Sequence, residues 1–259
     1  MRLNLFLDKK NCLQLNLNMQ PSEFALTIHK RLLDTYGIPE WRNPVSPLDE
    51  LVSTILSQNT NDTNRDRAFK SLKARFPTWE AVRDADEHEV IGAIRTAGLA
   101  NQKGPRIQNM LREITAQRGE LDLDFLEKLS TEEASDWLRS FKGVGPKTAA
   151  IVLQFSLDKP AFPVDTHIYR VTGRLGLRPQ KMNADRAHTY LAELFPPQSY
   201  YAVHLNIIRL GREVCHARRP DCEFCPLNDL CEYYTESSEK MAGAVLNHSH
   251  REKGQYGNR

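Results

Sequence analysis

The sequence has no excess of one charge and no long apolar run. Lysine and arginine total 35 against 33 aspartate and glutamate residues, for a net charge of +2. Such a balance creates no global field, so any affinity for nucleic acid has to come from a local basic patch. The apolar runs are far shorter than the about 20 residues that a membrane-spanning helix needs. We therefore expect no association with a membrane.

The N-terminus also lacks an export signal. The segment MRLNLFLDKKNCLQLNLNMQ contains no apolar stretch of signal-peptide length, because Asp8, Lys9 and Lys10 interrupt it. Nothing else in the sequence indicates an oxidising compartment. The protein is therefore expected in the cytoplasm, with its cysteines reduced.

Strand signals are scarce, and no internal repeat is visible. Leucines alternate with other residues only within residues 3–17, which predicts either a small hairpin or an unstructured leader over residues 1–20. Residues 235–259 are polar and lack periodicity, which predicts a disordered tail.

The body of the chain consists of one helical pattern after another, so the expected fold class is all-α. Apolar residues recur at helical spacing, for example at Phe24, Ile28 and Leu32, and they indicate a buried core rather than cofactor contacts. The residues placed to begin helices are Ser22, Ser46–Pro47, Asp62, Ser130 with Glu133, Asn183 and Gln198.

Four of the five cysteines lie close together near the C-terminus, in the pattern C-x6-C-x2-C-x5-C. Four thiolates in so short a segment can converge on one centre, which is what an iron–sulfur cluster requires. A structural zinc also takes four cysteines, although it usually takes them as two short pairs set well apart. Two disulfides would need an oxidising compartment. The candidate ligands are Cys215, Cys222, Cys225 and Cys231.

The first loop of this segment carries His216, Arg218 and Arg219. A loop that a metal centre holds and that presents cations is suited to bind phosphates. A solvated charged loop without function is the alternative.

A second informative segment is FKGVGPKTAA, residues 141–150. A helix ends at Phe141 and another begins at Pro146, and the glycines between them allow a tight turn with uncovered N–H groups. Such groups at a helix N-terminus can bind a phosphate, although a plain helix–helix turn would look similar. Lys147 faces the positive end of the helix dipole, where a cation is unfavourable. A nucleophilic amine would explain the choice, because the same field favours its neutral, reactive form.

The segment VDTHIYR follows at residues 164–170. Asp165 stands where a helix N-cap is expected, and capping is the simpler explanation for it. An aspartate at this point could also take a proton from Lys147 or stabilise positive charge on a sugar. His167 is interpreted as a hydrogen-bonded structural histidine.

The combination of GVGPKTA, VDTHIYR and C-x6-C-x2-C-x5-C resembles the endonuclease III family of helix-hairpin-helix DNA glycosylases with an iron–sulfur loop. The resemblance runs from about Ser22 to Cys231. It implies two helical lobes that flank a DNA-binding cleft. One lobe, residues 40–159, would be a six-helix barrel with the helix-hairpin-helix, and the other, residues 21–39 and 160–234, would hold the cluster.

The resemblance also implies roles for the residues of the three motifs. Lys147 would attack C1′ of a flipped-out nucleotide, and Asp165 would be the essential carboxylate beside it. Gly143 and Gly145 would present backbone amides to a DNA phosphate. The four cysteines would ligate a [4Fe–4S] cluster with a mainly structural role.

Two loops differ from the usual sequence of the family. Asn59 stands where members often carry a glutamine that fills the gap left in the DNA, and Gln58 precedes it. Leu99 resembles the apolar residue of a second wedge loop. Pro146 stands where many members have arginine, which removes one phosphate contact. These differences leave the base preference open.

The resemblance implies a monomeric, nucleoid-associated repair enzyme acting on double-stranded DNA that contains a damaged base or an abasic site. It would be a DNA glycosylase with AP lyase activity on oxidised pyrimidines, working through a lysine Schiff base. The alternatives are a mismatch or modified-cytosine glycosylase of the same fold, a non-enzymatic helix-hairpin-helix DNA-binding protein, and an iron–sulfur redox sensor.

Overall fold

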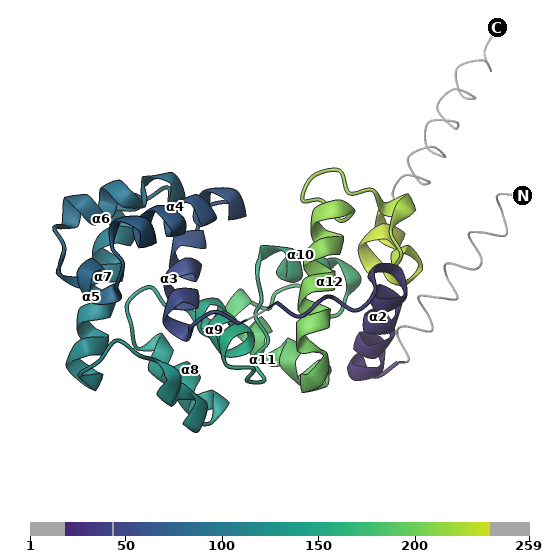
Figure 1. Cartoon of the computed structure of the whole chain (residues 1–259). Coiled ribbons are helices and arrows are strands. Elements are labelled where there is room, and N and C mark those ends of the chain that lie inside the picture. Colours follow the sequence, from purple (N-terminus) through teal and green to yellow (C-terminus); the bar gives the residue numbers. More distant parts are fainter. Residues whose placement is uncertain (1–18, 43, 239–259) are drawn as a thin grey trace, which may run out of the picture. The chain divides into compact units, whose positions relative to one another are not determined.

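The computed structural model describes residues 19–42 and 44–238 (Figure 1). Every regular element in these ranges is helical and none is a strand, which confirms the predicted all-α class. None of the described helices has the length and apolarity needed to span a bilayer. The predicted hairpin or leader within residues 1–18 and the tail from residue 239 onward lie outside the described residues.

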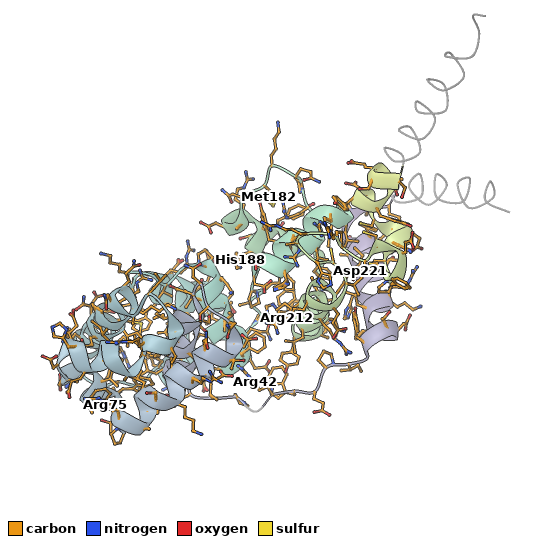
Figure 2. The ribbon with its side chains drawn as sticks, turned by 90° about the horizontal axis from the view of Figure 1, so that it is seen from above. Arg42, Arg75, Met182, His188, Arg212 and Asp221 are labelled. Atoms are coloured by element: carbon orange, nitrogen blue, oxygen red, sulfur yellow. The ribbon has the colours of Figure 1, made fainter. Side chains whose placement is uncertain are left out.

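The chain divides into two compact units, Glu40–Pro163 on the one hand and Met1–Pro39 with Val164–Arg259 on the other. Side chains of both units are drawn in Figure 2, with Arg75 in the central unit and His188 and Asp221 in the second. Each unit has its own packing and is described by itself.

In the central unit, α3 packs against α4 and α9, while α7 packs against α5 and α6. Its core includes the fully buried Leu51, Ile55, Ile107, Leu111 and Val152. The helices are α3 (Pro47–Ser57), α4 (Asp62–Arg75), α5 (Trp79–Asp84), α6 (Glu87–Ala93), α7 (Ala100–Arg118), α8 (Thr131–Arg139) and α9 (Pro146–Ser156), with the 3-10 turns η1 (Arg95–Ala97) and η2 (Asp124–Lys128).

In the second unit, the N-terminal helix packs with the C-terminal third of the chain, since α2 contacts α11 and α12 while α12 contacts α10. Arg31 on α2 extends this contact: its guanidinium donates to Pro226 O (3.0 Å) and to Asp229 Oδ1 (3.0 Å). The elements are α2 (Pro21–Tyr36), α10 (Thr166–Leu175), α11 (Ala184–Leu194), η3 (Pro197–Ser199), α12 (Tyr200–Glu213), η4 (Cys222–Phe224) and η5 (Asn228–Leu230).

Several predicted helix starts are confirmed, among them the caps at Ser46 and Asn183 and the capping box of Ser130 with Glu133. Three starts are wrong. The N-cap of α2 is Gln20 rather than Ser22, because Pro21 already occupies the first helical position. Asn61 rather than Asp62 caps α4, and Gln198 lies in η3, so that α12 begins only at Tyr200.

The predicted tail begins too early. Residues 232–238 are helical, and Thr235 is buried, with its hydroxyl donating to Cys231 O (3.2 Å). A segment that packs against the cysteine region is therefore ordered, even though its sequence is polar.

Candidate functional site

The turn of the helix-hairpin-helix spans residues 141–145, between α8 and α9. Val144 is buried and its N–H donates to Phe141 O (3.0 Å), which closes the turn. Gly143 has a φ of 89°, in the region that favours glycine. Within the described ranges, the N–H groups of Gly143 and Gly145 donate to no protein acceptor. They are therefore available to a ligand at the N-terminus of α9.

Lys147 is the second residue of α9, and its side chain is exposed. The first turn of α9 contains no acidic residue, and no side chain caps it. The following residues, Thr148, Ala149 and Ala150, are buried and fix the helix to its unit. Among the described residues the ammonium group of Lys147 has no ion-pair partner, so the amine remains accessible, while the buried neighbours fix the backbone from which it extends.

Asp165 is the N-cap of α10, as its position in the sequence predicts. Its Oδ1 accepts a hydrogen bond from the Ile168 N–H (2.7 Å), and the residue is half-buried. One carboxylate oxygen is thereby engaged in capping. Lys147 belongs to the central unit and Asp165 to the second unit.

The loop after α3 lies against the hairpin turn. Gln58 Nε2 donates to Gly143 O (3.0 Å), and Gln58 Oε1 accepts from Arg106 Nη1 (2.9 Å). Both polar atoms of the Gln58 side-chain amide are thus hydrogen-bonded within the protein. Asn59, by contrast, is exposed and has a φ of 54°.

Leu99 heads α7 with a φ of 50°, and its side chain is 48% exposed. An exposed leucine in a left-handed conformation is unusual, since that conformation costs energy for a residue with a Cβ. Asn59 and Leu99 therefore share two properties, an exposed side chain and a left-handed loop backbone, that mark candidate contact residues.

Arg106 is a residue of the candidate site that the sequence analysis missed. Its side chain lies under the turn so closely that a Cβ on Gly143 would be 2.4 Å from Arg106 Cδ. Arg106 belongs to none of the sequence motifs. The sequence could have indicated it only through its position shortly after the GLANQK segment.

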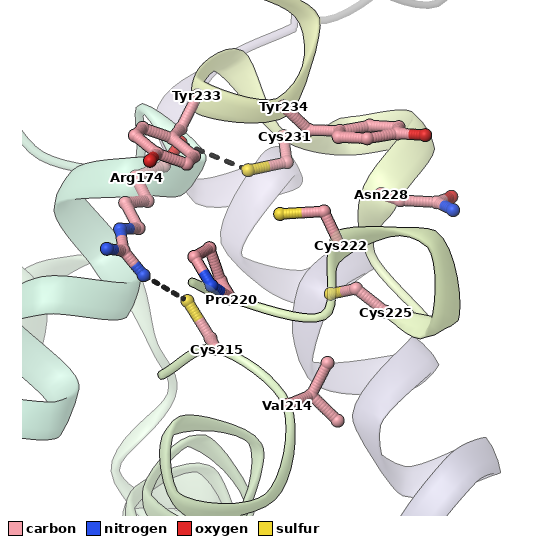
Figure 3. Close-up of a pocket in the computed structure, with 10 residues that line it drawn as sticks. All are labelled: Arg174, Val214, Cys215, Pro220, Cys222, Cys225, Asn228, Cys231, Tyr233 and Tyr234. Carbon is pink, nitrogen blue, oxygen red and sulfur yellow. Dashed lines mark hydrogen bonds between the residues drawn. The ribbon is translucent and has the colours of Figure 1, made fainter. Parts of the chain in front are cut away.

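The four cysteines line one pocket, shown in Figure 3 together with Arg174, Tyr233 and Tyr234. None of the four forms a disulfide. Burial raises the pKa of the Cys225 thiol to about 11 and that of Cys231 to about 12, and it also raises the pKa of Cys222. Buried thiolates of this kind need a positive group that compensates their charge, which a metal centre supplies.

The donor set fits an iron–sulfur cluster, since four thiols line the same pocket. A cluster takes one thiolate on each of several irons, so its ligands stand around a wider space. The side chains in Figure 3 surround such a space.

Arg174 on α10 holds the start of the cysteine loop through hydrogen bonds. Its guanidinium donates to Cys215 Sγ (3.2 Å), His216 O (2.6 Å) and Ala217 O (3.0 Å). Arg218 and Arg219 follow directly and are exposed, as a phosphate-binding role requires. Arg174 was also missed, because its place on a helix distant in sequence hides the contact.

The comparison with protein families identifies the fold. The model of the HhH-GPD superfamily of base excision DNA repair proteins matches residues 52–197. The chain belongs to this superfamily. The model of the iron–sulfur binding domain of endonuclease III matches residues 215–231, which contain all four clustered cysteines. The predicted [4Fe–4S] cluster is thereby confirmed, and the zinc and disulfide alternatives are rejected.

Individual relatives of this HhH-GPD protein agree. It is 31% identical over 229 residues to endonuclease III of Thermotoga maritima, across 88% of this chain and 99% of that protein. It is 43% identical over 167 residues to a putative DNA glycosylase of Arabidopsis thaliana, across 64% of this chain but only 57% of that longer protein. The solved structure of a trapped endonuclease III–DNA covalent intermediate matches with a TM-score of 0.73 and 25% identity, over 85% of this chain and 100% of that chain.

Proposed function

We propose that this protein is a base-excision-repair DNA glycosylase with AP lyase activity, which removes damaged, oxidised pyrimidines from double-stranded DNA. The observation that carries the proposal is Lys147, an accessible amine on the first turn of α9, directly after the hairpin turn. The likeness to the endonuclease III complex in which a covalent DNA intermediate was trapped supports a covalent route.

The proposed chemistry begins with extrusion of the damaged nucleotide, because its sugar carbon is inaccessible within the duplex. The neutral amine of Lys147 attacks C1′, the bond from C1′ to the base breaks, and the base leaves and takes up a proton from water. The Asp165 carboxylate stabilises the positive charge that develops on the sugar and accepts a proton from the C1′-bound ammonium. The C1′–O4′ bond then breaks, the nitrogen lone pair of Lys147 forms the C=N bond of an iminium, and O4′ takes the proton that Asp165 accepted.

The iminium makes the lyase step favourable. Loss of a proton from C2′ sends an electron pair toward the iminium, and the 3′ phosphate leaves, which breaks the strand by β-elimination. A water nucleophile would release the base but leave the backbone intact. A lysine at position 147 therefore distinguishes the combined activity from simple base removal.

Other residues would hold the DNA. The N–H groups of Gly143 and Gly145 and the exposed Arg218 and Arg219 would bind phosphates, while Asn59 and Leu99 would occupy the gap in the duplex. The cysteines would hold a cluster that keeps the arginine loop in shape. Because the side chain of Gln58 is hydrogen-bonded to Gly143 and Arg106, we assign to Asn59 the side-chain amide that would fill the gap left in the duplex.

Borohydride trapping tests the proposal. Reduction during turnover on a thymine-glycol duplex should yield a covalent protein–DNA adduct with the wild type and none with Lys147→Gln. Lys142→Gln is the matched control, because Lys142 is an exposed lysine of the same turn. An adduct that persists in Lys147→Gln would move the nucleophile to another amine, and its loss in Lys142→Gln would identify that amine as Lys142.

A further inference from the structure

Lys103 is buried far more completely than lysines usually are. Its side chain is only 2% exposed, and within the described residues it pairs with no carboxylate. Its Nζ donates instead to two backbone carbonyls, Leu56 O (2.7 Å) and Ala97 O (2.9 Å). Burial and the neighbouring Arg106 lower the pKa of this ammonium. An apolar side chain of similar length would fill the same space without a buried charge, so the lysine has a task beyond packing.

The two carbonyls lie where two helical segments end. Leu56 is in the last turn of α3, and Ala97 is the last residue of η1. Carbonyls at these positions have no partner within their own helix, and a cation at a helix C-terminus is electrostatically favourable. One ammonium group therefore joins the ends of two segments that are separate in sequence.

Both segments lead directly into the loops with the exposed, left-handed residues. The chain passes from Leu56 to Asn59, and from Ala97 through Gly98 to Leu99. The φ values of Asn59 and Leu99, 54° and 50°, are uncommon for residues with a side chain, and they persist only where the surroundings hold them. Lys103 holds the starting point of each loop.

We propose that Lys103 is a positioning residue that keeps the loops of Asn59 and Leu99 at a fixed separation, so that both side chains enter the duplex together when the damaged nucleotide is extruded. The inference rests on the proposed function and deepens it. Arg106, one turn further along α7, performs the corresponding task for the hairpin turn through Gln58. The first turns of α7 thus set the relative position of three loops of the central unit, those of Asn59, Leu99 and Gly143.

A matched control exists on the same helix. Gln108 is 0% exposed, and its Nε2 donates to Val82 O (3.0 Å) and Ala85 O (2.8 Å), at the end of α5. It is thus a second buried polar side chain of α7 that binds carbonyls at a helix end, but away from the loops. Lys103→Met and Gln108→Met each remove buried donors from α7, and only the first concerns the loops.

Hydrogen exchange on the free protein tests the anchoring without any assumption about DNA. In Lys103→Met, amides of residues 57–60 and 97–99 should exchange about tenfold faster, because both loops open more often. In Gln108→Met those amides should be unchanged, and the faster exchange should fall on residues 82–86. Equal exchange of both loops in the wild type and Lys103→Met would overturn the anchoring.

Base extrusion tests the consequence. A 2-aminopurine placed opposite the lesion should brighten as the wild type opens the duplex, and in Lys103→Met the rate should fall about tenfold or more, with little change in binding to undamaged duplex. In a Leu99→Ala background the same change should cost much less, since Lys103 acts through that loop. If Lys103→Met acted only through a general loss of folding, Gln108→Met should slow the brightening equally. The loss of rate from Lys103→Met should then add in full to that from Leu99→Ala, and these two results would overturn the inference.

The proposed function can fail separately from this inference. No brightening with the wild type would contradict extrusion, and with it the proposed repair activity. Normal brightening at equal rates in the wild type and Lys103→Met would contradict only the role of Lys103. Lys103→Gln, which keeps N–H donors on a shorter chain, should recover part of the rate if Lys103→Met folds poorly.

Discussion

At the scale of single residues, Asp165 has a structural role and a proposed chemical one, and two substitutions separate them. Asparagine caps a helix about as well as aspartate, so Asp165→Asn should keep the bond to the Ile168 N–H and the stability. Its single-turnover base release should still fall by about 10²-fold or more, because the charge is gone. Asp165→Ala should lose activity and also about 1 kcal/mol of stability. If Asp165→Asn is fully active in this assay while Asp165→Ala is destabilised, Asp165 serves only as a helix cap.

Arg218 and Arg219 are exposed residues whose role can be read from salt dependence. If each binds a phosphate, Arg218→Gln and Arg219→Gln should weaken damaged and undamaged duplex alike and lower the slope of log K against log salt by about one unit each. Lys181→Gln removes another exposed cation of the same unit and should leave the slope unchanged. Loss of lesion preference at an unchanged slope would point to base contacts instead.

At the scale of elements, the hairpin turn offers two glycines in opposite situations. An alanine at Gly143 would need a φ of 89° and would place its Cβ 2.4 Å from Arg106 Cδ, whereas nothing lies within 4 Å of a Cβ at Gly145. Gly143→Ala should therefore lower the free energy of unfolding by about 1–3 kcal/mol, and Gly145→Ala by less than about 0.5 kcal/mol. Chemical denaturation measures both.

Binding should separate the same pair in another way. If the Gly145 N–H approaches a DNA phosphate, the added methyl group of Gly145→Ala should weaken DNA binding in a protein of normal stability. Normal binding by a stable Gly145→Ala would show that this amide is not used.

Elements differed in how far the sequence could predict them. Helices with caps and long apolar stripes were found, as with Ser130 and Glu133 on α8. The short helices α5 and α6 were missed, because Trp79–Asp84 and Glu87–Ala93 are too short to show a period. The residues of the three sequence motifs could be predicted from local sequence patterns alone. Lys103, Arg106 and Arg174 act through contacts between segments far apart in the chain, and periodicity carries no signal for such contacts.

At the scale of the whole molecule, each unit contributes one of the two proposed chemical residues and one of the proposed phosphate-binding elements. The central unit carries Lys147 with the hairpin amides. The second unit carries Asp165 on the helix whose Arg174 also binds Cys215 Sγ. The cysteine loop and the carboxylate are thus parts of one packed assembly around α10, which gives a structural reason for a cluster in this unit.

The activity of the whole protein is tested best by a panel of duplexes on which base release and strand scission are scored separately. A thymine-glycol duplex should lose its base and be cut in the same reaction, because the Lys147 iminium leads on to β-elimination. An abasic duplex should be cut without the glycosylase step, and Lys147→Gln should neither release the base nor cut the strand, although it should still bind the duplex.

Base release that leaves the strand intact until alkali is added would make the enzyme monofunctional. Preference for a mismatched thymine or a modified cytosine over the oxidised base would instead favour the other glycosylase of this fold. The ranking of substrates would therefore report the base preference, and strand scission would report the proposed role of Lys147.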